Sequence, residues 1–88
     1  MQETIAALRA TRPYLFEGGR EELVQKIIDK IKDDPNLDRL YKRAVRFEMR
    51  TQRLRDKGLL SWEAYLRRKA VWHAVRAVWR AKAGLDIL

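Results

Sequence analysis

The sequence predicts an all-α fold: a small helical bundle of three main helices plus a short N-terminal helix, with a long C-terminal αα-hairpin. Apolar residues recur every three or four positions through the long segments, which is the period of an amphipathic helix. The sequence has no sustained alternation of apolar and polar residues and no Asn-Gly or Asp-Gly pair that would predict a β-hairpin. Two prolines and four glycines interrupt the 88 residues, and they fall between the expected helices or directly after the last one.

The N-terminal part is expected to hold two helices. The first covers residues 3–11 and stops before Pro13, which cannot continue it. Residues 14–16 follow as a compact apolar plug, and two glycines then provide a flexible turn. The second helix covers residues 20–32. Its apolar face is formed by side chains at helical spacing: Leu23, Val24, Ile27, Ile28 and Ile31.

Two longer helices are expected over residues 36–57 and 62–82. Gly58 is a natural stop signal for the first of them, and Ser61 is a natural N-cap for the second. Each helix is about 21 residues and therefore roughly 30 Å long. Because the link between them is so short, they should be antiparallel neighbours.

The turn of this hairpin resembles a known element. Residues 54–65 read Leu-Arg-Asp-Lys-Gly-Leu-Leu-Ser-Trp-Glu-Ala-Tyr. A leucine followed by Gly-Leu-(Ile/Leu)-(Ser/Thr)-x-Glu-x-(Tyr/Phe) and basic residues is similar to the short C-terminal hairpin domain attached to many unrelated bacterial and phage proteins. The resemblance implies a helical turn and a generic interaction element, and it implies no activity.

Length and composition indicate a single domain with a modest core. Eighty-eight residues correspond to one helical domain, residues 1–88, in which residues 1–33 cover the apolar face of a basic hairpin at 36–83. A chain this short buries a modest core, and without cysteine it has no disulfide to supplement that core. Association with another chain is therefore expected.

The sequence lacks the signals of a membrane or secreted protein. No apolar run approaches the roughly 20 residues that span a bilayer. Residues 1–15 lack the continuous apolar stretch and the cleavage site of a signal peptide. We therefore expect no membrane span and a cytoplasmic location, or the host cytoplasm or the virion if the protein is viral.

The charge is distributed unevenly. The formal net charge is +8. Residues 1–38 hold six Lys/Arg and eight Asp/Glu, a net of −2, whereas residues 39–82 hold fourteen and three, a net of +11. Ten of those fourteen bases are arginines, whose guanidinium is a rigid fork of donors suited to phosphate. The asymmetry indicates a polyanionic partner or an acidic partner surface.

The sharpest feature lies on the third expected helix. At 100° per residue, seven bases fall within one arc of about 100° that holds no acid. These bases are Arg39, Lys42, Arg43, Arg46, Arg50, Arg53 and Lys57. A solvated face normally mixes signs, because like charges one turn apart destabilise a helix, so we favour an anion-binding surface. Plain solvation remains open, and so does pairing with the acids of the N-terminal part, namely Glu17, Glu21, Glu22, Asp29, Asp33 and Asp38.

The fourth helix carries a second pattern. Aromatic residues recur every seven positions on one stripe, at Tyr65, Trp72 and Trp79. The neighbouring stripe is basic, with Lys69, Arg76 and Arg80. Aromatic rings interleaved with bases can stack on unpaired nucleobases, although core packing or a helix–helix interface is the commoner use of such a stripe. We also expect a homodimer through this helix, with Trp72 and Trp79 at or near the contact.

Catalysis is not expected. His73 is the single histidine and there is no cysteine, so neither a metal-ligand pair nor a nucleophilic triad is indicated. The glycine pair at 18–19 lacks the flanking Gly and Lys of a phosphate-binding loop. The acids between residues 29 and 38 suit helix capping and counter-charge better than a metal site. No catalytic residue, metal or cofactor is therefore predicted.

These observations predict a small nucleic-acid-binding protein, binding DNA or RNA through the phosphate backbone with little sequence preference. A viral or plasmid-encoded nucleoprotein would fit this design. The alternative is a protein-interaction adaptor or small structural subunit that docks an acidic partner through the same stripe. The candidate binding residues are the seven bases of the third helix together with Lys69, Arg76 and Arg80. The candidate interface or stacking residues are Tyr65, Trp72 and Trp79.

Overall fold

The structure, a computed structural model, describes residues 1–87 and confirms the all-α fold. Its elements in chain order are α1 (Gln2–Thr11), the 3-10 helix η1 (Pro13–Phe16), α2 (Arg20–Ile31), α3 (Leu37–Asp56) and α4 (Trp62–Lys82). Residues 1–87 contain no strand. In the same range no helix has the length and apolar character that a bilayer-spanning segment needs. Each α-helix begins and ends within one residue of the segment expected from the sequence.

The two long helices begin at residues whose side chains cap them. Asn36 Oδ1 accepts a hydrogen bond from the backbone N–H of Arg39 at 3.2 Å. Ser61 Oγ accepts one from the N–H of Ala64 at 3.1 Å. Each bond satisfies one of the N–H groups that a helix start leaves without a partner. Asn36 therefore precedes α3 as its cap, instead of forming its first residue.

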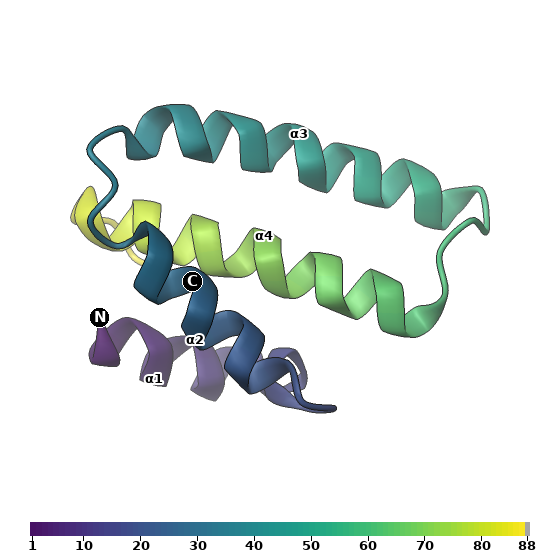
Figure 1. Ribbon diagram of the computed structural model, residues 1–88, viewed down its shortest axis with the longest axis horizontal. Helices are drawn as coiled ribbons and strands as arrows, with labels where there is room; N and C mark the ends of the chain where they lie inside the picture. Colours follow the sequence, from purple (N-terminus) through teal and green to yellow (C-terminus); the bar gives the residue numbers. More distant parts are fainter. Residues whose placement is uncertain (88) are drawn as a thin grey trace.

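Gly58 ends α3 and turns the chain. Its φ of 69° is a left-handed conformation that a side chain disfavours. The N–H of Gly58 donates to the carbonyl of Arg55 (2.8 Å), and the N–H of Leu59 donates to that of Leu54 (2.9 Å). These paired bonds form a Schellman motif. The chain then reverses, so that α3 and α4 run antiparallel as the expected αα-hairpin (Figure 1).

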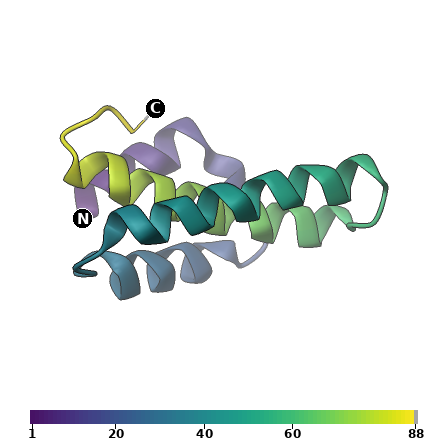
Figure 2. The same ribbon diagram turned by 90° about the horizontal axis from the view of Figure 1, so that it is seen from above.

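The helix α4 lies in the middle of the molecule. The helix α3 packs along one side of it, and α1, η1 and α2 pack against its other sides (Figure 1). Seen from above, α1 and α2 flank the hairpin and leave its turn end projecting beyond them (Figure 2). The molecule measures 36 × 26 × 21 Å.

The core lies between α4 and the N-terminal elements. Fully buried side chains come from each of them: Leu8 of α1, Leu15 of η1, Val24 and Ile28 of α2, and Val78 of α4. In α3 the buried residues are Ala44 and Thr51. The helix α3 therefore rests on α4 along a narrow strip, and its opposite side faces the solvent.

Candidate functional site

The seven bases singled out on the third helix lie on one outward surface, here called the α3 basic face. All seven side chains are exposed. They are Arg39, Lys42, Arg43, Arg46, Arg50, Arg53 and Lys57. Because Ala44 and Thr51 are buried against α4, helical periodicity turns these bases to the opposite side of α3. The structure thus brings the seven residues together on one surface.

The acids considered as internal partners do not neutralise this face. Glu21 pairs with Arg9 of α1. Asp29 pairs with Lys32, three residues along the chain, at 3.7 Å. Among the described residues, no side chain of the α3 basic face takes part in a salt bridge or a side-chain hydrogen bond. No salt bridge therefore neutralises its positive charge within this part of the chain.

The concentration of like charge lowers the stability of α3. The seven bases form seven pairs three or four residues apart, and each like pair destabilises a helix by about 0.2–0.5 kcal/mol. Arg53 and Lys57 lie at the C-terminal end of α3, where the helix dipole favours bases. The same dipole disfavours Arg39 in the first turn. The dipole therefore accounts for the bases at one end of the face and not for those at the other.

A shallow hollow lies at the C-terminal end of the α3 basic face. It has a volume of about 360 Å³ and is lined by Arg50, Arg53, Leu54 and Lys57. Three basic side chains from successive turns therefore surround one space. Several donors converging on one point suit an oxyanion such as a phosphate, since charge-assisted hydrogen bonds are the strong ones.

The three bases predicted on the fourth helix do not belong to this face. Lys69 pairs with Glu48 where α3 meets α4, and its side chain is 14% exposed. Arg76 and Arg80 donate hydrogen bonds to backbone carbonyls of the C-terminal segment, residues 86–87. These side chains hold parts of the chain together, and the α3 basic face stands apart from them.

The aromatic stripe of α4 is divided between two places. Trp72 and Trp79 are half-buried and stack on Tyr41 of α3, with ring centroids 5.9 and 4.1 Å away. This is helix–helix packing, the commoner use of an aromatic stripe at heptad spacing. Tyr65 instead stacks with Trp62 near the hairpin turn, at 5.6 Å. The homodimer through α4 stays a prediction, in which a second copy would meet the outer edges of Trp72 and Trp79.

His73 is buried, with 8% of its surface exposed. Burial, and after it the charges of Arg12, Lys69 and Arg76, lower the pKa of His73 to about 3. The imidazole is therefore neutral at neutral pH and packs as an uncharged side chain. Within residues 1–87, no group of three or more His, Cys, Asp or Glu side chains is placed to hold a metal ion.

Two structurally important residues, Arg20 and Trp62, belong to none of the patterns found in the sequence. Arg20 is 3% exposed and donates to the carboxylate of Glu63 (3.1 Å) and to the carbonyl of Tyr14 (2.8 Å). It thereby ties η1 to the start of α4. Trp62 is 62% exposed and lies outside the heptad stripe that contains Tyr65. The sequence feature that could have indicated the exposure of Trp62 is its position directly after the predicted cap Ser61, in the first turn of α4.

Comparison with known proteins does not assign the chain to a family. No protein-family model matches the chain, and neither a curated protein nor a solved structure matches it significantly. The resemblance carried by residues 54–65 stays a local one. The function is therefore inferred from the surface itself.

Proposed function

We propose that this protein binds nucleic acid through the α3 basic face, by sequence-tolerant contacts to the phosphate backbone. The observation that carries the proposal is the exposure of seven bases, five of them arginines, that form no salt bridge among the described residues. Gathering so much like charge on one helix face lowers stability. An external polyanion offsets that loss, and nucleic acid supplies closely spaced phosphates along its length.

The geometry of the face suits a backbone contact. Arg46, Arg50 and Arg53 lie on consecutive turns of a helix that is 20 residues long. A rise of about 1.5 Å per residue places such neighbours about 4.5–6 Å apart along the axis. The face can therefore contact several phosphates at once, and the guanidinium fork can bind each through two hydrogen bonds. Contacts from Arg and Lys to phosphate oxygens carry no sequence information, which supports sequence tolerance.

The salt dependence of binding tests the proposal. The triple variant R46Q/R50Q/R53Q keeps a good helix propensity and removes three phosphate contacts. For the wild type, log affinity for an oligonucleotide should fall linearly with log salt. The triple variant should reduce that slope by about 2 to 3 units and weaken binding to all sequences alike. An unchanged slope would overturn the proposal.

A matched control separates this face from net charge. The variant K26Q/K30Q/R67Q also removes three exposed positive charges, all outside α3. Its binding should stay close to that of the wild type. If the two triple variants weaken binding equally, then overall charge drives association and the assignment of the face is wrong.

A second candidate function is a protein-interaction adaptor that docks an acidic partner. An apolar groove of about 280 Å³ favours it, since this groove runs between α3 and α4 next to the basic face. Its lining consists of Leu40, Arg43, Ala44, Phe47, Val71 and Val75. An acidic amphipathic helix could place its apolar side in the groove and its carboxylates against the bases. Phe47→Ala should weaken the binding of such a peptide and leave oligonucleotide binding intact, which distinguishes the two functions.

A further inference from the structure

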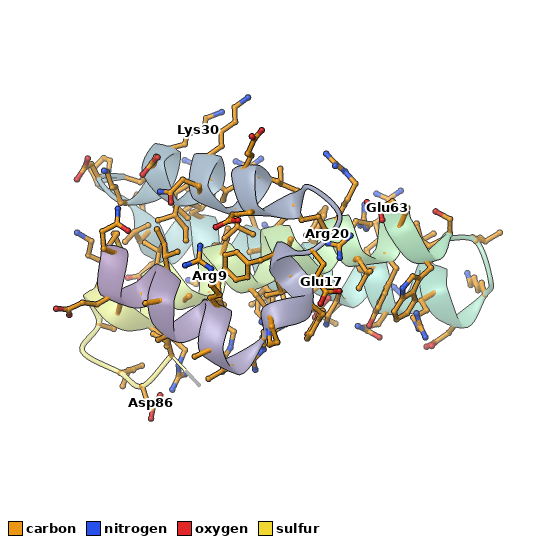
Figure 3. The ribbon with its side chains drawn as sticks, turned by 90° about the horizontal axis from the view of Figure 1, so that it is seen from below. Arg9, Glu17, Arg20, Lys30, Glu63 and Asp86 are labelled. Atoms are coloured by element: carbon orange, nitrogen blue, oxygen red, sulfur yellow. The ribbon has the colours of Figure 1, made fainter. Side chains whose placement is uncertain are left out.

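A pocket of about 420 Å³ lies where η1 meets the start of α4. Its walls are largely aromatic, with one carboxylate and one amine among them. They are formed by Tyr14, Glu17, Trp62, Tyr65, Leu66 and Lys69. Figure 3 shows this junction from below, with Glu17, Arg20 and Glu63 close together.

The outer wall of the pocket is an exposed aromatic pair. Trp62 leaves 62% of its surface open to solvent while its ring stacks on Tyr65 at 5.6 Å. The guanidinium carbon of Arg55 lies 5.1 Å from the ring centre of Trp62 and 4.2 Å from that of Tyr65. The two rings are therefore held together, carry a cation beside them and still present an open aromatic surface.

Arg20 fixes the two walls relative to each other. Its buried guanidinium donates to the carbonyl of Tyr14 (2.8 Å) on one wall. It also donates to the carboxylate of Glu63 (3.1 Å), the neighbour of Trp62 on the other. Because one side chain holds both walls, the pocket exists before a ligand arrives, and binding loses less free energy to ordering.

We infer that this pocket holds one unpaired nucleobase of a strand whose phosphates lie on the α3 basic face. The inference rests on the proposed function and narrows it from nucleic acid in general to single strands. Every nucleobase has a π-face that stacks on an aromatic side chain, and an arginine beside the ring adds a cation–π contribution. A carboxylate such as that of Glu17 accepts a hydrogen bond from the amino group of a base.

The pocket and the end of the α3 basic face both lie near the hairpin turn. The face ends at Lys57, five residues before Trp62, and Arg55 connects this end of α3 to the aromatic rings. Arg55 lies on the side of α3 that faces α4, so a strand leaving the hollow at Arg53 and Lys57 would pass around the hairpin turn to reach the pocket. A base in a duplex could enter only after unpairing and unstacking, which costs a few kcal/mol. The pocket therefore favours strands whose bases are already free.

Three ligands of equal length test the inference: a single-stranded oligonucleotide, the same strand built from abasic sites, and a duplex. Trp62→Ala should weaken binding of the single strand by between about 5-fold and 150-fold, the effect of losing one stacked base. It should leave the abasic strand and the duplex unaffected, and the salt slope unchanged, because no phosphate contact is lost. Trp62→Phe keeps a ring and should recover most of the affinity.

Two further variants make each outcome decisive. Leu59→Ala removes another exposed apolar side chain (66% exposed) from the hairpin turn, and should leave all three ligands unaffected. A Trp62→Ala protein that binds the single strand as tightly as the wild type overturns the pocket assignment. In the same assay, R46Q/R50Q/R53Q should weaken all three ligands. That result keeps the proposed function in place even where the pocket fails, whereas no weakening by this variant overturns the proposed function itself.

Discussion

Tyr41 of α3 and Trp79 of α4 lie almost parallel, with ring centroids 4.1 Å apart and planes inclined by 9°. The indole N–H of Trp79 also donates a hydrogen bond to the carboxylate of Asp38, one turn before Tyr41, at 2.7 Å. One side chain thus makes two contacts across the end of the hairpin that lies opposite its turn. Together they fix the register of α3 on α4 where no covalent link does so.

Removal of this side chain should loosen the hairpin measurably. Trp79→Ala should lower the free energy of unfolding by about 2 to 3 kcal/mol, somewhat less than for a fully buried tryptophan. Trp79→Phe keeps the stack and loses the hydrogen bond, so its loss should be about 1 kcal/mol. Urea unfolding gives both values. Equal losses in the two variants would show that the stack on Tyr41 contributes nothing.

The helix boundaries could be predicted because their signals are local. Ser61 caps α4 with its own side chain, and Gly58 adopts the left-handed conformation that ends α3. The central place of α4 could not be predicted in the same way. An apolar stripe shows which face of a helix is buried, and it does not show against which partner.

The candidate site, like the fold, could be predicted from the sequence only in part. The period of the helix decides which bases share a face, so the α3 basic face follows from spacing alone. The contacts of Lys69 depend instead on how α3 and α4 are aligned, because Glu48 must lie opposite it. The pocket at Trp62 depends on where Tyr14 of a distant segment packs. Both are tertiary relationships, and no local pattern specifies them.

Removing one member of the Glu48–Lys69 pair should lower the free energy of unfolding more than removing both. The two side chains are 17% and 14% exposed and form a salt bridge. Lys69→Met leaves a largely buried carboxylate without its partner, and should lower the free energy of unfolding by about 3 kcal/mol. Changing both residues to Met replaces the pair with apolar groups and should restore most of that loss. A double variant as unstable as the single one would show that Glu48 is not the cause.

His73 should make stability depend on pH. The pKa of His73 is lowered from its ordinary value of 6.5 to about 3 in the folded state, so between these values the unfolded state alone binds the proton. The stability that depends on a neutral His73 is therefore complete above pH 6.5. As the pH falls toward 3, the free energy of unfolding decreases by up to about 1.4 kcal/mol per pH unit. The groups that face it are bases, namely Arg12, Lys69 and Arg76. Unfolding measured from pH 7 to pH 5 should show this slope in the wild type and not in His73→Gln, and the same slope in both would assign it to other groups.

Partial discharge of the α3 basic face should stabilise the protein. R46Q/R50Q/R53Q removes five of the seven like-charge pairs on α3, each worth about 0.2–0.5 kcal/mol. Against this, the loss of Arg53 from the last turn removes a favourable dipole interaction of about 0.3–1 kcal/mol. The free energy of unfolding should therefore rise by about 1 kcal/mol at low salt, and the gain should shrink at high salt because ions screen exposed charges. Urea unfolding at two salt concentrations measures both effects. The control K26Q/K30Q/R67Q removes no like-charge pair of α3 and loses Lys30 from the last turn of α2, so it should not raise the free energy of unfolding. If these bases are paired with acids of the same chain, the triple variant should instead lower the free energy of unfolding. A lower stability of the R46Q/R50Q/R53Q variant at low salt would mean that these bases are compensated within the chain, and it would remove the physical reason for giving them a polyanionic partner.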